Sequence, residues 1–321
     1  MDKSIPIKKS INQLKLFGYN DFFNNFIKMK ENNSLPNSIL LSGSKGIGKS
    51  TFAYHFINYV LSNNENDSYL TKENLINNNN YSYKLLSSNV HPNFFLLECQ
   101  NSEGEIKVDN VRILINFINK STYSQKFKFI LIDSVEKLNV NSSNALLKAI
   151  EEPPKNTFFF LIHDDSYKIL NTIKSRASTY KLYFNIEAKR NIFINLLKQY
   201  EIDIYYNDLI DDFYFDSPGN LIKYISYLDK ENVALLKNTL YCINYFIDGY
   251  INDKNPEYLP FISVFIEKYY NELSLKKIKN VNNLFFNFSN ILKKIHELKK
   301  FNLNKKDIFF DIKNILLNDS K

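Results

Sequence analysis

Residues 43–50 read GSKGIGKS, and this stretch decides the fold class of the 321-residue chain. It matches in full the pattern G-x-x-x-x-G-K-[ST] of a phosphate-binding loop, or P-loop. An apolar run, SILLS at 38–42, precedes the loop and predicts a buried strand, while KSTFAYHFINYVLS at 49–62 has the spacing of a helix. A strand, a glycine-containing loop and a helix in this order are the context that a P-loop requires.

Each part of this loop suits the binding of a nucleotide phosphate. Glycines let backbone N–H groups turn inward around the phosphates, and the helix that follows adds the positive end of its dipole. Lys49 is placed to reach the β- and γ-phosphates, and the Ser50 hydroxyl is placed to ligate Mg²⁺. We therefore expect ATP or ADP with Mg²⁺ as the cofactor, bound by Gly43, Ser44, Lys45, Gly46, Ile47, Gly48, Lys49, Ser50 and Thr51.

A second Mg²⁺-associated residue is expected at the end of another strand. The apolar run FKFILID at 127–133 ends in Asp133, whose carboxylate suits this role beside Ser50. In P-loop proteins that hydrolyse ATP, a glutamate that activates the attacking water follows this aspartate, whereas here the next residue is Ser134. A serine is no base near neutral pH, so we expect little or no hydrolysis by this chain itself.

Beyond the loop, strand and helix patterns alternate and then give way to helices alone. Alternation of this kind predicts a parallel sheet with helices on both faces. From about residue 185, helical periodicity continues to the end of the chain. The predicted strands are 38–42, 94–98, 127–133, 157–162 and 180–184, and the predicted domains are 1–183 (nucleotide-binding), 184–232 (small helical) and 233–321 (all-helical).

Composition favours a cytoplasmic, reduced protein. No stretch reaches about 18 uncharged apolar residues, so no membrane span is expected, and the N-terminus lacks the apolar core of a signal peptide. Cys99 and Cys242 lie far apart and have no metal-ligand spacing. Residues 276–321 hold 11 lysines and 4 acidic residues. Their net charge of +7 equals that of the whole chain. This basic region predicts either contact with nucleic acid or acidic partners, or simply solvated helix faces.

Two further stretches carry a resemblance to a known family. Residues 144–162 read NALLKAIEEPPKNTFFFLI, and residues 170–178 read LNTIKSRAS. They resemble the NALLK-x-LEEPP segment and the Ser-Arg-Cys motif of the clamp-loader branch of the AAA+ ATPases, with Ala177 in place of the cysteine. The resemblance extends from the P-loop through Arg176, and more loosely into the helical remainder. It implies that the two helical domains are a lid and a collar for oligomerisation.

The resemblance also implies partners and a role for Arg176. Clamp loaders are pentamers that open a ring-shaped sliding clamp and place it on primed DNA. Each ATP site lies between neighbours, and the arginine of the Ser-Arg-Cys motif reaches the site of the next subunit in trans. By this resemblance Arg176 is a catalytic arginine finger, and the partners are gamma/tau-type ATPases and a delta subunit in a hetero-pentamer, with the clamp and primed DNA. The alternative is an arginine paired with a local carboxylate.

Three departures from the active ATPases of this family indicate which subunit type the chain resembles. Ser134 replaces the catalytic glutamate, and His163 stands at the sensor position where threonine or serine is usual. The lid stretch DSPGNLIKY at 216–224 lacks the arginine that active subunits direct at the γ-phosphate. This stretch and ELKKFNLNKKDIFF at 297–310 resemble the delta prime family of clamp-loader chains. Residues 63–92 hold no cysteine, so we expect no zinc site where many clamp-loader chains have one.

Two other functions stay open from the sequence. The chain is either an active gamma/tau-type ATPase, against which Ser134 and the missing lid arginine argue, or a scaffold that binds no nucleotide. A AAA+ branch-migration or initiator ATPase would share the P-loop, but it would not explain the stretches at 144–162 and 170–178.

Overall fold

The computed structural model describes residues 7–99, 104–120, 127–202, 213, 215–227, 238–253, 258–276, 281–301 and 305–319. The chain divides into two compact units, Pro6–Lys223 and Tyr224–Lys321. The predicted boundary at 232/233 between the two helical domains lies outside the described residues.

The first unit is built on a five-stranded parallel sheet, as predicted. The strands pair in the order β2-β3-β4-β1-β5, and every pair is parallel. Strands β1 and β3 are buried at every residue, which is typical of a parallel sheet covered on both faces. The strands are β1 (Ser38–Gly43), β2 (Phe94–Leu97), β3 (Lys128–Ile132), β4 (Thr157–Asp164) and β5 (Ser178–Lys181).

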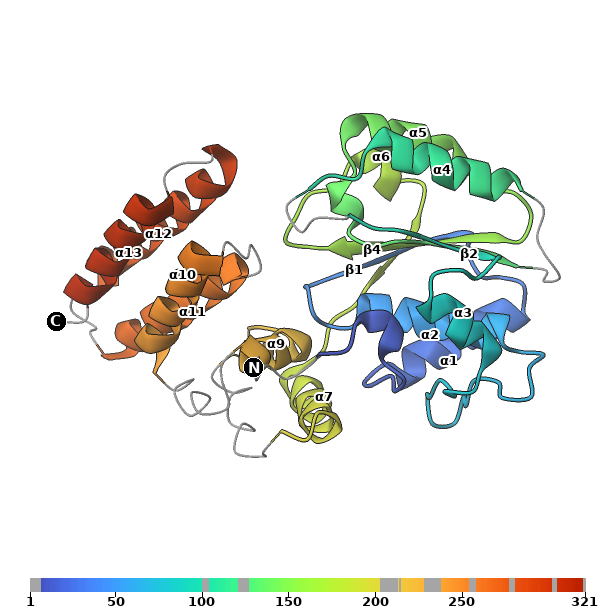
Figure 1. Ribbon diagram of the computed structural model, residues 1–321, viewed down its shortest axis with the longest axis horizontal. Helices are drawn as coiled ribbons and strands as arrows, with labels where there is room; N and C mark the ends of the chain where they lie inside the picture. The colour runs from blue at the N-terminus through green and yellow to red at the C-terminus, as the bar shows by residue number, and fades with distance from the viewer. Residues whose placement is uncertain are drawn as a thin grey trace. The chain divides into compact units, whose positions relative to one another are not determined.

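Helices cover both faces of this sheet (Figure 1). One face carries α1 (Asn20–Glu31), α2 (Lys49–Leu61) and α3 (Tyr81–Ser87). The other carries α4 (Val108–Asn119), α5 (Val140–Glu151) and the short α6 (Asn171–Lys174). Two 3₁₀ turns, Ser10–Asn12 and Val135–Lys137, and the helices α7 (Ile186–Gln199) and α9 (Pro218–Tyr227) complete the described elements up to residue 227.

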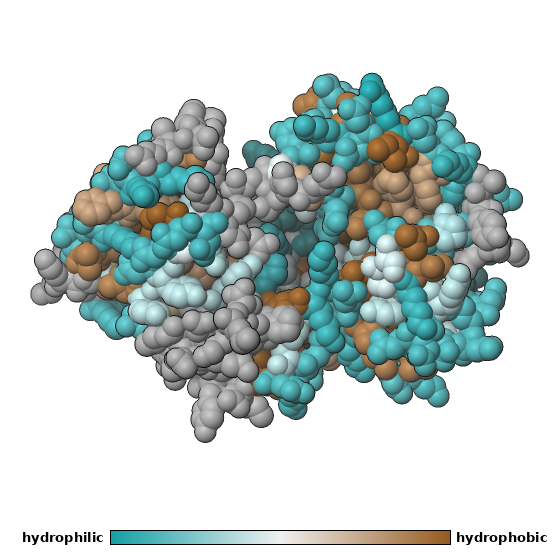
Figure 2. Space-filling view, in the orientation of Figure 1, coloured by the Kyte–Doolittle hydropathy of each residue, from teal (hydrophilic) through white to brown (hydrophobic). Residues whose placement is uncertain are grey.

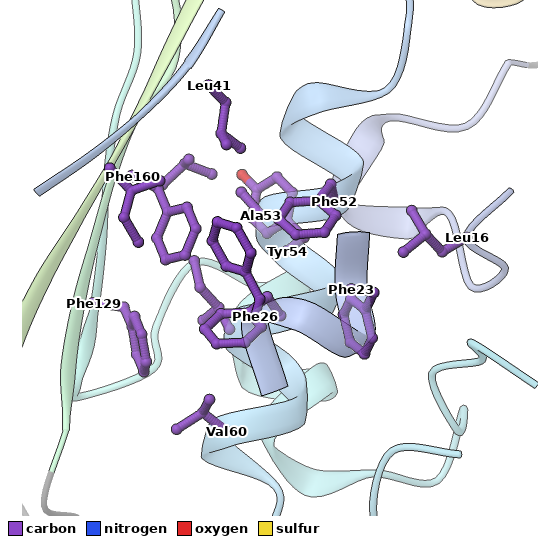
Figure 3. Packing of buried hydrophobic residues seen from close by; sticks show 14 of the residues in the cluster. Leu16, Phe23, Phe26, Leu41, Phe52, Ala53, Tyr54, Val60, Phe129 and Phe160 are labelled. Carbon is purple, nitrogen blue, oxygen red and sulfur yellow. The ribbon is translucent and has the colours of Figure 1, made fainter. Parts of the chain in front are cut away.

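A separate apolar core lies on each side of the sheet. The core between the sheet and α1–α3 is rich in aromatic rings, and Figure 3 shows Phe129 and Phe160 of the strands facing Phe26 of α1. Phe26 and Phe52 meet edge to face with ring centroids 5.2 Å apart, a favourable geometry for aromatic pairs. The core under α4–α6 is mainly aliphatic and includes Leu146, Ile150 and Ile173. These two cores fix the loops at both ends of the strands.

The cysteine-free stretch 63–92 is held by hydrogen bonds and by buried apolar residues. The Glu65 carboxylate accepts hydrogen bonds from the backbone N–H groups of Tyr81 and Ser82, the first two residues of α3, at 2.8 and 3.0 Å. His55 of α2 is bonded on both sides, by the Tyr69 hydroxyl at its Nδ1 and by the Gln13 carbonyl at its Nε2. The stretch therefore packs as part of the first unit.

The second unit is helical in its described residues. Phe246, Phe265 and Tyr250 are buried in its core, and the Tyr269 hydroxyl donates to the Leu316 carbonyl at 2.9 Å. Lysines of the basic region form ion pairs on its surface, for example Lys294 with Asp311 at 2.8 Å. Its helices are the end of α9, then α10 (Thr239–Asp253), α11 (Tyr258–Lys276), α12 (Val281–Phe301) and α13 (Lys305–Asp319).

Figure 2 shows a mainly hydrophilic surface on the visible face, with scattered hydrophobic patches. Among the described helices, none is both long and apolar enough to cross a bilayer.

Candidate functional site

The P-loop forms a tight turn between β1 and α2. Gly43 is the last residue of β1, and Gly48 is the N-cap residue of α2. Gly46 and Gly48 have φ angles of +84° and +89°, in the left-handed region that glycine adopts without a steric penalty. The backbone thus takes the course that the sequence pattern predicts, and the start of α2 points its free N–H groups at the loop.

Lys49 is buried at the centre of the loop. Its Nζ donates hydrogen bonds to the carbonyls of Gly43 at 2.6 Å and Ser44 at 2.7 Å. Burial lowers the pKa of Lys49, while nearby carboxylates, Asp164 and Asp165 first, act to raise it. The ammonium group is therefore held at a defined position on the loop, where a phosphate anion would add a favourable charge.

Ser50 and Asp133 meet although they lie far apart in the sequence. The Ser50 hydroxyl donates to Asp133 Oδ2 at 3.0 Å, from the first turn of α2 to the residue after β3. Both side chains are only partly buried. Mg²⁺ prefers oxygen ligands and commonly uses one or two protein groups together with phosphates and water. This pair therefore fits the Mg²⁺ ion that the P-loop implies.

His163, at the predicted sensor position near the end of β4, is engaged at both ring nitrogens. Its Nε2 lies 2.9 Å from the Tyr167 carbonyl, and its Nδ1 lies 2.9 Å from the Ser42 hydroxyl. A carbonyl only accepts, so Nε2 carries the proton and Nδ1 accepts from Ser42. The ring therefore links β4 to β1, and a sensor role for His163 stays a prediction.

Three carboxylates that sequence reasoning did not assign to the site lie near enough to Lys49 to act on its charge. Asp164 is the last residue of β4 and Asp165 follows it, and Glu136 lies in the turn after Ser134. Glu136 Oε2 accepts a hydrogen bond from the backbone N–H of Asp164 at 3.3 Å, and burial raises its pKa. Ser134 itself has a left-handed backbone, with φ at +64°. The sequence signal for this group was the pair of aspartates that comes one residue after the predicted strand 157–162.

The stretch predicted as the lid contacts the P-loop through two glycines. The N–H of Gly219, in the first turn of α9, donates to the Gly46 carbonyl at 3.2 Å. A Cβ atom at Gly219 would lie only 2.4 Å from this carbonyl oxygen, and one at Gly46 would lie 2.2 Å from the Ser217 hydroxyl. The two backbones can approach this closely only because neither residue has a side chain.

Arg176 lies at the opposite edge of the sheet from the P-loop. It precedes β5, whose first residue Ser178 pairs with Ile39 near the start of β1. Gly43, at the end of β1, is four residues further along, roughly 13 Å at strand spacing. The Arg176 Nε donates to Glu151 Oε2 at 2.8 Å, and its Nη1 donates to the Thr172 carbonyl at 3.2 Å. The local carboxylate partner considered from the sequence is thus present.

Comparison with protein families matches residues 18–185 to the family described as "DNA polymerase III, delta subunit". The chain belongs to this family. The match covers the whole sheet, with the P-loop, Asp133, His163 and Arg176. The resemblance to the delta prime family of clamp-loader chains is therefore confirmed.

Similar curated proteins include delta prime and gamma subunits of DNA polymerase III, and two of the delta prime subunits show the extent of the similarity. One from Pseudomonas aeruginosa is 36% identical over 138 residues, which cover 43% of this chain and 40% of the relative. One from Buchnera aphidicola subsp. Baizongia pistaciae is 33% identical over 171 residues, which cover 52% and 48%. The chain spans less than half the length of these two curated relatives. Among solved structures, a gamma subunit-related protein of Thermotoga maritima aligns over 92% of this chain and 99% of its own, with 15% identity and a TM-score of 0.46.

Proposed function

We propose that the chain is a delta prime-type subunit that binds ATP or ADP but hydrolyses it poorly, and that supplies Arg176 to a neighbouring ATPase. In this proposal it works in the cytoplasm, in a hetero-pentamer with gamma/tau-type ATPases and delta that loads a sliding clamp on primed DNA during replication. Residues 184–232 act as the lid and 233–321 as the collar. The observation that carries the proposal is the placement of the P-loop and Arg176 at opposite edges of one sheet.

Nucleotide binding is supported by the chemistry of the loop. Lys49 would bind the β- and γ-phosphates, and Ser50 and Asp133 would associate with Mg²⁺, because their oxygens already lie 3.0 Å apart. Bound Mg²⁺ would neutralise charge on the phosphates. The left-handed turns at Gly46 and Gly48 shape the loop without strain.

Poor hydrolysis is supported by the residues next to Asp133. Ser134 has no group that accepts a proton near neutral pH. The nearest carboxylate along the chain, Glu136, is bonded to the backbone N–H of Asp164. It therefore caps the end of β4, and the position directly after Asp133 lacks a base.

The finger role of Arg176 is supported by the polarity of the parallel sheet. All strands run the same way, so the ends that carry Lys49 and Asp133 form one edge and the start of β5 forms the other. Arg176 is thus directed away from the P-loop of its own chain, and a phosphate on a neighbouring subunit is the acceptor that a finger in trans requires. Arginine fingers contribute about 10³–10⁵ in rate in GTPases.

The test is ATP turnover by the reconstituted complex of this chain with its ATPase partners, delta, the clamp and primed DNA. Arg176→Ala is expected to lower turnover by about 10³-fold or more at partner sites that depend on this arginine, while light scattering shows unchanged assembly. Lys49→Ala in this chain should leave the partner sites active, because it removes only this chain's own nucleotide contact. Unchanged turnover with Arg176→Ala in an intact complex would refute the finger role.

A further inference from the structure

The Arg176 side chain is held by two acceptors from the two segments that carry the family resemblance. Glu151 ends α5 in the stretch 144–162, and Thr172 belongs to α6 in the stretch 170–178. The Glu151 carboxylate accepts from Nε at 2.8 Å, and the Thr172 carbonyl accepts from Nη1 at 3.2 Å. Both distances are normal for hydrogen bonds, and the one to Glu151 is charge-assisted.

These two contacts fix the base of the guanidinium group and leave its far end unused. Within the described part of the chain, the hydrogen bonds of Arg176 involve Nε and Nη1 only. Guanidinium carries five N–H donors in one rigid plane. Nη2 and the second N–H of Nη1 therefore remain for an acceptor outside this chain, in the paired geometry that suits a phosphate.

The helix ends that carry the two acceptors are anchored in the core. Ile150, next to Glu151, and Ile173, next to Thr172, are both buried in the same aliphatic core, at 2% and 1% exposure. The Ser38 hydroxyl also donates to the Ile150 carbonyl at 2.9 Å, which ties the end of α5 to β1. Acceptors carried by fixed helix ends limit the orientations open to the group that they bind.

We propose that Glu151 is a positioning residue for Arg176: it holds the guanidinium by Nε so that the far end faces the phosphate on a neighbouring subunit. This inference rests on the proposed finger role. The Glu151 and Arg176 side chains are 55% and 31% exposed, and pairs this exposed stabilise a fold only slightly. The contact therefore acts on orientation, and its loss should appear in turnover while assembly is unchanged.

The experiment is a double-mutant cycle in the reconstituted complex, with kcat and KM for ATP measured for each variant. Glu151→Ala removes the acceptor, and Glu151→Gln keeps an acceptor oxygen without the charge. Glu152→Ala is the matched control, because Glu152 is the neighbouring exposed glutamate and forms no ion pair within the described residues. All three are also made in the Arg176→Ala background.

We expect Glu151→Ala to lower kcat by about tenfold with KM and assembly unchanged, since a misplaced catalytic group costs rate more than binding. Glu151→Gln should lower kcat by a smaller factor, and Glu152→Ala should leave kcat unchanged. In the Arg176→Ala background, Glu151→Ala should have no further effect. A normal kcat for Glu151→Ala, or an equal loss in both backgrounds, would overturn the positioning role while Arg176→Ala still lowers turnover. If Arg176→Ala itself changes nothing, the finger role fails as well.

Discussion

The glycine contact between the lid stretch and the P-loop makes a specific prediction for Gly219→Ala. The added Cβ would lie 2.4 Å from the Gly46 oxygen, 0.6 Å inside the 3.0 Å limit that real Cβ contacts respect. The neighbour is backbone, so no flexible side chain can turn away. The displaced carbonyl belongs to the Gly46–Ile47 peptide, whose N–H would be a phosphate donor in the proposed nucleotide site. Either α9 lifts from the loop or this peptide shifts.

The magnitude follows from the cost of overpacking. Forcing one extra carbon into a packed site costs about 1–3 kcal/mol, and the helix preference of alanine over glycine offsets up to about 1 kcal/mol. A net cost of about 1–2 kcal/mol corresponds to roughly 5- to 30-fold weaker binding of ATP. Part of the cost would appear as a lower Tm of the first unit.

The assay is equilibrium binding of a fluorescent ATP analogue, with thermal unfolding measured alongside. Gly249→Ala in α10 is the control, because it is the same substitution in the other unit and its nearest neighbour is the Tyr258 ring at 2.9 Å, a side chain that can move. The reasoning is refuted if Gly219→Ala binds the analogue as tightly as the wild type with the same Tm. It is also refuted if Gly249→Ala weakens binding as much.

Two further predictions concern Mg²⁺ and pH. Asp133→Asn should reduce the enhancement of analogue binding by Mg²⁺ by about tenfold, or about 1.4 kcal/mol, because an amide is a poorer Mg²⁺ ligand than a carboxylate; titration with and without Mg²⁺ checks this, and an unchanged enhancement would contradict it. Burial lowers the pKa of both His55 and His91 to about 4, against about 6.5 when unfolded, so the folded state keeps them neutral. Above pH 6.5 these histidines are neutral in both states and leave the free energy of unfolding unchanged. As the pH falls from 6.5 toward 4, only the unfolded state takes up the protons, so the free energy of unfolding decreases. Urea unfolding between pH 7 and 4 should show this slope, and His91→Asn should make it shallower; an equal slope in the variant would contradict the assignment.

Much of the first unit could be predicted because its signals are local. The P-loop glycines, the apolar strands and the helical spacing each act over a few residues, and the first four strands lie within two residues of the predicted bounds. The predicted bounds of the fifth strand, 180–184, were wrong. The strand runs Ser178–Lys181 and shares only two residues with the prediction. Only Tyr180 is even partly buried in it, so an edge strand with little apolar pattern gave a weak signal.

The contacts that define the site could not be predicted, because they depend on tertiary packing. Asp164 and Glu136 approach Lys49 only once β3 and β4 lie side by side. The contact between Gly46 and Gly219 joins residues 173 positions apart, and the hydrogen bond between Ser42 and His163 depends on the pairing of β1 with β4. No pattern within either segment marks such a contact. Arg176 was found from a motif, yet its partner Glu151 emerged only from the structure.

The polarity of the parallel sheet has a consequence for how the proposed activity depends on concentration. In the proposed assembly, a chain with its phosphate loop on one edge of the sheet and its arginine on the other would associate head to tail, and contacts of this kind are heterologous. One molecule can never complete a site by itself. The rate contribution of Arg176 therefore follows mass action: it disappears when the assembly is diluted below its dissociation constant, although every chain stays folded with its side chains in place.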